Sequence, residues 1–414
     1  MLNKLNSSLR VRVLNDTINI ADRYAKKLGI TRVINITPLD RVGIPVYSST
    51  RPDSLSLCVN AGKGLTTEEA YTSAIMEAIE YAYAEQRYNK AEVFFDSFAN
   101  ILIKYADRVY TNDFLLLINK KLNLKENIPW IICKDILNNR EVPVPAELIL
   151  NPFPENLGDQ IFGANTNGLA SGNNRLEATI HGILEVIEHD IRSFQLIKDT
   201  SRIVTLSSLS EDLFKLIEKI KKAGFCLWVR SVENEFGLPF FYCYIMEKGN
   251  KNPYFINSGY GCHFSKDIAI TRAITEAAQS RLTFIQGSRD DLIFYRNLFS
   301  KMTPEEKTFF LRRLLDKAEN KRHRINYNSI PERDISESLN TLYSSLIDIL
   351  KKAGFNRIIR FNYSKPWEKL QVVRVIIPEM ESFSNASPKV GKRLLLFFKE
   401  NKSNDNGMST LRRA

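Results

Sequence analysis

Three stretches of the sequence, residues 60–80, 165–190 and 258–281, each combine a glycine-bearing loop with a helix that carries acids on one face. In each helix the acids stand among Ala, Ile, Met and Leu, where a packed face is expected. A carboxylate on a packed face is costly unless it is paired or binds a metal ion. The recurrence therefore predicts a shared site for a polyanion and a metal.

In the first stretch, Ser73, Glu77 and Glu80 stand at positions i, i+4 and i+7. At about 100° per residue they fall within roughly 60° of one another on a helix. A surface stripe more often alternates Glu with Lys, yet no Lys or Arg occurs between residues 64 and 86. A solvated acidic face on a long helix stays open as an alternative.

In the second stretch, Glu177, Glu185 and Glu188 again share one face, with offsets of 8 and 11 residues. Asn174 is placed to cap this helix with Glu177 at the third position, so a structural role is open for Glu177. The preceding loop, which contains Asn167, offers small residues and exposed amides of the kind that cradle phosphates.

In the third stretch, Arg272, Glu276 and Gln279 repeat the first spacing, and Arg281 follows. An Arg and a carboxylate one turn apart are often an ordinary intrahelical ion pair, and this alternative stays open. Lys63, between two glycines, does not have P-loop spacing, but a lysine in that position can still reach a phosphate.

The composition limits the class of protein and of metal. The 414 residues are 44% hydrophobic and 25% charged, as in folded soluble proteins. With no long apolar run and no secretory signal, we expect no membrane span and a cytoplasmic location. The five cysteines form no C-x-x-C pair, which argues against zinc and disulfides. An oxygen-liganded hard cation, Mg²⁺, is the expected metal.

The formal net charge of +11 raises the question of a nucleic-acid partner. The basic residues are spread over the chain, however, and no RRM, zinc-finger or helix-turn-helix pattern is present. Anionic nucleotides or an acidic peptide account for the charge at least as well. We therefore expect no nucleic-acid partner.

The elements that must position these residues indicate an α+β fold. A helix is predicted over residues 9–29, and broken short strands over 33–52. Thr66 and Glu69 form a capping-box pattern at the start of the first acidic helix. Two helices ending at Gly224 and Gly354 each lead into a strand.

The predicted organisation is an N-terminal helical segment, a large domain and a tail. These cover residues 1–30, 31–398 and 399–414, with a charged helical excursion at 287–335. The tail is polar and has little to bury, so we expect it to be disordered.

Four ordered blocks of the sequence resemble the YcaO family. They are TPLDRVGIPV (37–46), NAGKG followed by S-x-x-x-E-x-x-E (60–80), NGLASG followed by E-x-x-E-H-D (167–190), and RAITEAAQSR (272–281). The late VVRVIIPEME (372–381) is also similar to the family. The resemblance covers roughly residues 30–395.

The resemblance implies the YcaO-type ATP-binding fold, with ATP and Mg²⁺ as cofactors and activation of an amide by phosphorylation of its oxygen. Metal ligation is then assigned to Glu77, Glu80, Glu185 and Glu188. The residues expected around the nucleotide are Lys63, Ser73, Asn167, Glu177, Glu276, Gln279 and Arg281. The catalytic residues expected from the resemblance are Glu77, Glu188 and Gln279.

Two positions depart from the family pattern, which commonly has Arg after each E-x-x-E motif. Here Tyr81 and His189 stand at those positions. Replacing an arginine, which is always charged, by Tyr or His is expected to weaken contacts with phosphate more than it affects the fold.

Azoline-forming members of the family typically have a proline-rich C-terminal segment, whereas the last four residues of this sequence are LRRA. The resemblance thus favours thioamide formation, often aided by a separate TfuA-like protein that helps deliver sulfur. The expected substrate is a ribosomal peptide or protein, or a small amide-like molecule such as a purine base. Azoline formation with a partner protein and a non-catalytic scaffold remain alternatives, and a homodimer is expected from the resemblance.

Overall fold

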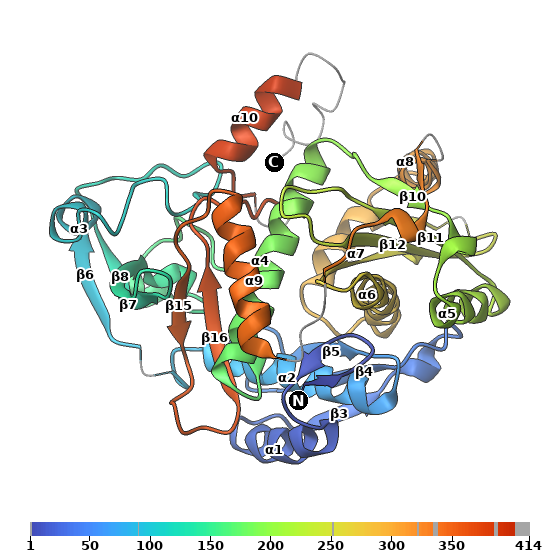
Figure 1. Cartoon of the computed structure of the whole chain (residues 1–414), viewed down its shortest axis with the longest axis horizontal. Helices are drawn as coiled ribbons and strands as arrows, with labels where there is room; N and C mark the ends of the chain where they lie inside the picture. The colour runs from blue at the N-terminus through green and yellow to red at the C-terminus, as the bar shows by residue number, and fades with distance from the viewer. Residues whose placement is uncertain are drawn as a thin grey trace. The chain divides into compact units, whose positions relative to one another are not determined.

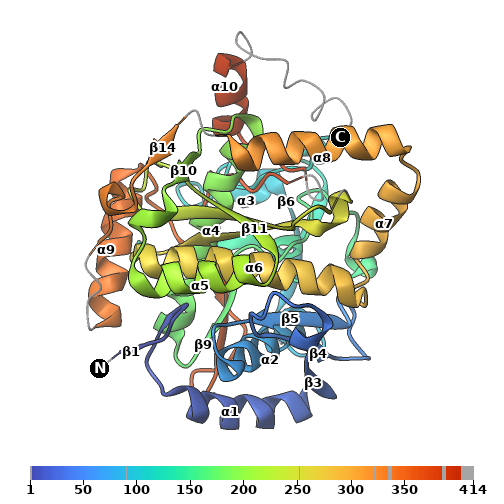
Figure 2. The same cartoon turned by 90° about the vertical axis from the view of Figure 1, so that its right-hand side faces the viewer.

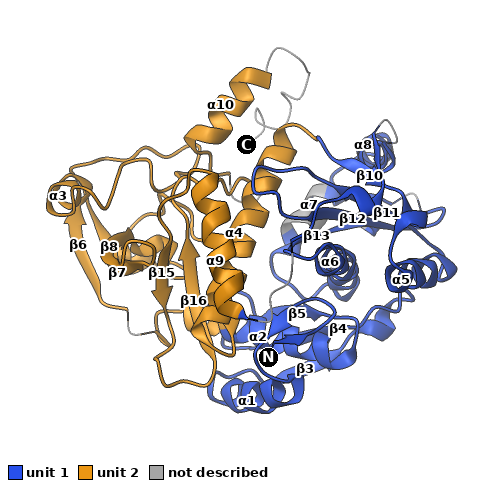
Figure 3. Cartoon of the chain, in the orientation of Figure 1, with its two compact units in different colours: residues 1–79, 200–338 blue, residues 80–199, 339–414 orange. Residues whose placement is uncertain are grey.

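The computed structural model describes residues 2–89, 91–250, 252–320, 323–333, 338–384 and 388–401. The chain forms two compact units, each built from two separate segments (Figure 3). Unit 1 contains Met1–Ile79 and Thr200–Ser338, and unit 2 contains Glu80–Asp199 and Leu339–Ala414. Of the predicted tail, residues 402–414 lie outside the described residues, and the predicted domain limits stay predictions.

The larger sheet of unit 1 has the strand order β13-β12-β11-β10-β14. All its pairs are antiparallel except β10 with β14. Its strands are β10 (Arg202–Val204), β11 (Phe225–Ser231), β12 (Phe240–Glu247), β13 (Ile256–Cys262) and β14 (Arg324–Ile325). The helices are α5 (Glu211–Lys222), α6 (Lys266–Gln286), α7 (Leu292–Ser300) and α8 (Pro304–Glu319).

The core of unit 1 lies between this sheet and two helices. Ile217 and Ile220 of α5, Ile274 of α6 and Leu227 and Val229 of β11 belong to one buried cluster. Figure 2 shows α5 and α6 along one face of the sheet and α8 along the other. The amphipathic pattern of α5, closed by Gly224 at a φ of 91°, confirms the predicted helix–glycine–strand order.

A smaller sheet of unit 1, with the order β3-β4-β5, leads into the first acidic helix. The elements here are β1 (Asn3–Lys4), β2 (Leu9–Arg10), α1 (Leu14–Lys27), β3 (Arg32–Asn35), β4 (Val46–Thr50), β5 (Val59–Lys63) and α2 (Thr67–Ala84). The prediction of a helix from residue 9 is wrong at its start, because Leu9 and Arg10 pair with Lys4 and Asn3. The helix begins only at Leu14.

The sheet of unit 2 has the order β6-β7-β15-β16-β9, with β8 also paired to β7. Its strands are β6 (Val93–Ser97), β7 (Asn127–Asp135), β8 (Arg140–Pro145), β9 (Leu169–Gly172), β15 (Ile359–Asn362) and β16 (Gln371–Ile376). The helices are α3 (Phe98–Lys104), α4 (Arg175–Ile197), α9 (Leu339–Lys352) and α10 (Lys392–Asn401). Helix α4 packs on β9 and β16, and α9 packs on α4 (Figure 1).

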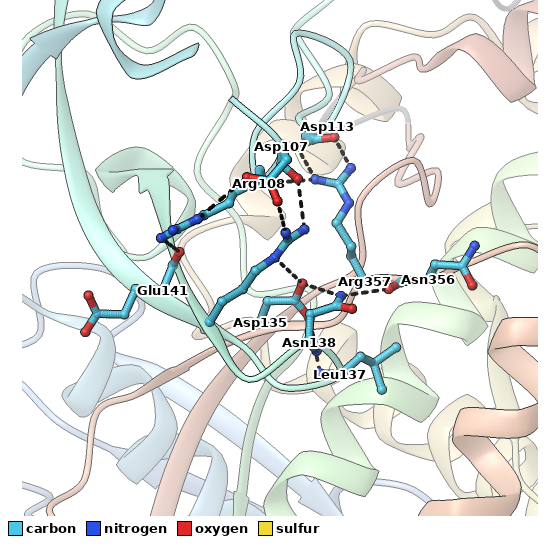
Figure 4. A network of polar contacts seen from close by, with 10 residues as sticks. Asp107, Arg108, Asp113, Asp135, Leu137, Asn138, Glu141, Asn356 and Arg357 are labelled. Atoms are coloured by element: carbon cyan, nitrogen blue, oxygen red, sulfur yellow. Dashed lines mark hydrogen bonds and ion pairs between the residues drawn. The ribbon is translucent and has the colours of Figure 1, made fainter. Parts of the chain in front are cut away.

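A polar network joins three loops of unit 2 (Figure 4). Arg357 holds Asp113 through both guanidinium nitrogens and also donates to the carbonyl of Arg108 at 3.1 Å. Asp135, at the end of β7, accepts a hydrogen bond from Asn138 at 2.7 Å. These contacts hold the loops to one another.

Among the described residues, no helix combines the length and the hydrophobicity that a membrane-spanning segment needs.

Candidate nucleotide and metal site

The three loop–helix units are built by the same close approach of a strand to the helix that follows it. A Cβ on Gly62 of β5 would lie 1.9 Å from the backbone nitrogen of Ala74 in α2. A Cβ on Gly259 of β13 would lie 2.3 Å from that of Ala277 in α6. Only glycine permits these contacts, so the glycines set how each acidic helix packs against its strand.

The second unit uses Gly172 in the same way. A Cβ there would lie 2.6 Å from the backbone nitrogen of Ala178 in α4. Asn174 caps α4 by accepting a hydrogen bond from the Glu177 backbone at 2.8 Å, which confirms the predicted cap. The Glu177 carboxylate is buried and accepts hydrogen bonds from the backbone and side-chain nitrogens of Asn173, each at 3.1 Å.

In unit 1, α2, β5 and α6 bring several predicted residues together. Lys63 Nζ lies 2.9 Å from Glu276 Oε2 in a partly exposed ion pair. Such a pair contributes about 1 kcal/mol or less, so a phosphate can compete for the lysine. Gln279 donates to the carbonyl of Ala61 at 2.7 Å.

Glu77 lies in the same cluster, and Ser73 lies one turn before it on α2. Loss of water around the carboxyl raises the pKa of Glu77, while the charges of Arg289 and Lys63 partly oppose the shift. The buried Asn60 side chain acts on the Glu77 carboxyl and also opposes the rise of its pKa. The sequence patterns missed Asn60 and Arg289.

Arg281 is occupied by contacts within unit 1. Its guanidinium binds Asp40 at 2.7 and 3.2 Å and is only 3% exposed. It also packs over the rings of Phe225 and Phe255. These contacts supply a structural role for Arg281, while its expected nucleotide contact stays a prediction.

In unit 2, Glu80 accepts hydrogen bonds from the backbone nitrogen and hydroxyl of Ser171, at 2.8 and 2.5 Å. These bonds hold the end of α2 against β9. On α4, Glu188 is buried with 6% exposure and Glu185 is half-buried. Glu80, Glu185 and Glu188 are thus held on two helices whose packing is fixed by glycine contacts.

Arg374 of β16 carries a positive charge that acts on Glu185. It is buried and donates to the backbone and side-chain oxygens of Asn165 at 2.7 and 3.0 Å. Burial lowers its pKa, and the Glu185 charge opposes that shift. A single Arg inside the apolar run VVRVIIP is the sequence signal that could have identified it.

His189 is neutral in this environment. Burial, together with the charges of Arg192 and Arg374, lowers its pKa to about 3. The imidazole therefore does not replace the positive charge of the arginine common in the family.

On the loop before β9, Asn167 donates to Ser382 Oγ at 3.3 Å, and its buried Oδ1 lacks a partner.

The residues present fit Mg²⁺ and a nucleotide. Carboxylate oxygens are the donors that Mg²⁺ prefers. In unit 2, the buried Oδ1 of Asn167, which has no hydrogen-bond partner, is suited to a polar ligand. Within the described part of the chain, no three His, Cys, Asp or Glu side chains form a ready-made metal cluster. Mg²⁺ bound to few protein groups usually keeps water and phosphate oxygens as its other ligands.

The sequence profile described as "YcaO cyclodehydratase, ATP- and Mg²⁺-binding" matches residues 61–381. The chain therefore belongs to the YcaO family of ATP-dependent enzymes, with ATP and Mg²⁺ as its cofactors. The predicted family and mixed α+β fold are confirmed.

Two relatives are described only as uncharacterized. One, from Methanothermobacter thermautotrophicus, is 32% identical and the match covers 92% of this chain and 97% of that protein. The other, from Rhizobium leguminosarum bv. trifolii, lies "in tfuA 3'region" and is 29% identical, covering 86% of this chain and 85% of that protein.

Solved structures share the fold. YcaO from Methanopyrus kandleri, solved with AMPPCP and Mg²⁺, has a TM-score of 0.73 at 22% identity, covering 94% of this chain and 97% of that one. A heterocyclase solved with substrate and cofactor also has a TM-score of 0.73, at 18% identity, covering 95% of this chain and 56% of that one.

Proposed function

We propose that this enzyme uses Mg²⁺ and ATP to activate an amide carbonyl and then replaces its oxygen with sulfur, giving a thioamide. The observation that carries the choice of sulfur is the similarity to the protein encoded in a tfuA 3' region. A TfuA-like protein is the partner that this branch of the family suggests. The substrate is a ribosomal peptide or protein, or a small molecule with an amide-like carbonyl.

The acids of α2 and α4 are the proposed metal ligands. Glu77, Glu80, Glu185 and Glu188 supply the carboxylate oxygens. When bound, ATP would supply the phosphoryl group that converts the amide oxygen from a poor leaving group into a good one. Mg²⁺ would neutralise the negative charge of that phosphoryl group. The protein holds these acids on helices, so the carboxylates need not change position during the reaction.

The remaining predicted residues are proposed to orient the nucleotide. Lys63, half-buried at the end of β5, provides a cation for a phosphate. Ser73, Asn167 and Gln279 provide neutral hydrogen-bonding groups, and Glu276 releases Lys63 when a phosphate binds. Glu177 and Arg281 act through the contacts that hold the loops in place.

The test is mass spectrometry of a candidate peptide incubated with enzyme, Mg·ATP and sulfide, with and without a TfuA-like protein. Exchange of one oxygen for one sulfur, dependent on ATP, supports the proposal. Loss of water without added sulfide supports the second candidate, azoline formation with a partner. That candidate is favoured by the fold neighbours described as heterocyclases. Absence of nucleotide binding at millimolar ATP supports a scaffold and contradicts both.

A further inference from the structure

Two arginines of unit 2 are joined through one threonine. Arg175 is the first residue of α4, and Arg360 lies in β15. Arg360 Nη1 donates a hydrogen bond to the Thr179 hydroxyl at 3.0 Å, and that hydroxyl donates to the carbonyl of Arg175 at 2.6 Å. A single hydroxyl therefore separates the Arg360 guanidinium from the backbone of Arg175.

The described helix and sheet positions that adjoin the two arginines carry no acid. In the sheet, Arg360 is paired with Lys134 of β7 and with Val375 of β16. On α4, the residues three and four positions after Arg175 are Ala and Thr. Among the residues that the structure describes, neither guanidinium forms an ion pair, and the buried Nε of each has no hydrogen-bond partner.

Two half-buried positive charges without a counter-charge are costly. Burial and then the charge of Arg175 lower the pKa of Arg360, and Tyr343 opposes the shift. Lys134 has Glu141 as its cross-strand partner on β8, so the uncompensated charges are those of the two arginines. A water molecule can complete hydrogen bonds here, but only an anion also neutralises the charge.

The arginine pair lies on the side of α4 away from the proposed metal ligands. At about 100° per residue, Glu185 and Glu188 lie roughly 120° and 180° from Thr179 around the helix. Thr179 faces the sheet, because its hydroxyl meets Arg360 of β15. An anion held there is therefore separate from a nucleotide bound through the acids.

The charge and shape of the pair define the ligand. Each planar guanidinium offers parallel N–H donors that match a carboxylate or a phosphate. A carboxylate carries a single negative charge, whereas a phosphate group carries about 1.5 to 2 at pH 7 and offers three acceptor oxygens. Of the two, the phosphate is the one that balances both arginines.

We propose that Arg175 and Arg360 form a binding site for a phosphate group, separate from the site for ATP and Mg²⁺. Thr179 holds the Arg360 guanidinium beside the start of α4. Free inorganic phosphate and the phosphate monoester of a larger ligand present the same oxygens to the pair. The site does not depend on sulfur transfer, so its failure would leave the proposed function untouched.

Calorimetry with sodium phosphate tests the site in the whole protein, with Mg·AMPPCP in excess so that the nucleotide site is filled. Wild type should bind one phosphate. Arg175→Gln and Arg360→Gln should each weaken that binding about ten- to hundredfold, the value of one charged hydrogen bond. Arg312→Gln, at an exposed arginine of α8, is the matched control and should bind as wild type. No binding at millimolar phosphate, or equal affinity in wild type and both site variants, overturns the proposal.

Thermal unfolding gives a readout that also reports whether each variant folds. A ligand that binds only the folded state raises the melting temperature. Phosphate should therefore raise the melting temperature of wild type and of Arg312→Gln, and raise that of Arg360→Gln less. An equal rise in all three proteins contradicts the site.

Arsenate shows where the anion binds, because it has the shape and charge of phosphate and scatters X-rays anomalously. Wild-type crystals soaked in sodium arsenate with Mg·AMPPCP should show an anomalous peak within hydrogen-bonding distance of both guanidiniums. Crystals of Arg360→Gln should show none there. Water alone at that position in wild type overturns the proposal.

Glycerol 2-phosphate separates the two sources of the phosphate group. Binding of this monoester as tightly as inorganic phosphate, with the same loss in Arg360→Gln, supports a phosphate carried by a larger ligand. Binding of inorganic phosphate alone supports the free ion.

Discussion

At the scale of single residues, the account depends most on the acids of α4. Glu188 is buried on α4 among apolar residues, and the charge of Arg374 interacts with Glu185, one turn before Glu188. A buried carboxylate is costly unless it is paired or binds a metal ion. The charge of Glu188 should therefore matter for Mg²⁺-dependent nucleotide binding.

Glu188→Gln should weaken binding of Mg·ATP about tenfold or more, because the amide retains the shape but loses the charge. Isothermal titration calorimetry measures this. Glu155→Gln, at an exposed glutamate of the same unit, is the control and should bind as wild type. Equal affinity of Glu188→Gln and wild type contradicts metal ligation by Glu188.

His189→Arg tests the departure from the family pattern. A third guanidinium beside Arg192 and Arg374 should destabilise unit 2 by about 1–3 kcal/mol, because burial already keeps the imidazole neutral. Urea unfolding measures the change, with His189→Gln as the uncharged control. Unchanged stability together with tighter nucleotide binding would show that the site accepts the family's arginine.

At the scale of elements, the close approach of a strand to the following helix organises each acidic unit. Gly62→Ala should destabilise the protein by about 3 kcal/mol or more, because the new Cβ meets backbone atoms that no rotamer change can move. Gly249→Ala, in an open turn at a φ of 75°, should cost about 1 kcal/mol. Chemical denaturation compares the two, and equal effects would contradict the packing argument.

His263 makes the start of α6 sensitive to acid. Its Nδ1 accepts a hydrogen bond from the Ser265 nitrogen at 3.1 Å. Burial and the charges of Arg272, Arg10 and Lys4 lower its pKa from 6.5 to about 3. A depressed histidine pKa means that the unfolded chain binds the proton first, so stability should fall as the pH drops below 6.5.

The expected loss from His263 is up to about 2–3 kcal/mol between pH 6.5 and about pH 4.5. His263→Asn keeps an acceptor for Ser265 and cannot gain the charge, so its unfolding free energy should depend less on pH over that window. Urea titrations at several pH values give both slopes. Parallel slopes for the two proteins contradict a buried neutral His263.

The sequence patterns predicted elements whose signals are local. Asn174 caps α4 and Gly224 ends α5 because capping and left-handed turns depend on neighbouring residues. The start of α1 could not be predicted, because the pairing of Leu9 with Lys4 competes with the helix there. The contact of Arg357 with Asp113 joins residues 244 positions apart, and no local signal predicts such a partner.

At the scale of the whole molecule, both compact units are discontinuous in sequence. In unit 2, β7 and β9 are separated in the sheet by β15 and β16, which come from the later segment. Residues 80–199 alone keep the pairing of β6, β7 and β8 but leave β9 without an adjacent strand, so the fragment should melt at a lower temperature than the whole protein. Near-ultraviolet circular dichroism and thermal melting of that fragment measure this, and a transition at the temperature of the whole protein would contradict the topology.

The candidate site was predictable to the extent that its residues stand in repeated motifs. Glu77 with Glu80, and Glu185 with Glu188, share the E-x-x-E spacing, and their role as metal ligands stays a prediction. Arg374 was not named as a site residue, because a single buried Arg in an apolar strand forms no repeat and its surroundings come from distant residues. Its partner Asn165, for example, is 209 residues away in the chain.

The central claim, ATP-dependent replacement of oxygen by sulfur, is tested most directly by one measurement. Purified enzyme, Mg·ATP, sulfide and a candidate substrate are incubated with a TfuA-like protein, and the product is examined by high-resolution mass spectrometry. The account predicts a product in which one oxygen is exchanged for one sulfur, absent without ATP and absent with Glu188→Gln. A product that has lost water and gained no sulfur, formed equally without sulfide, would contradict it.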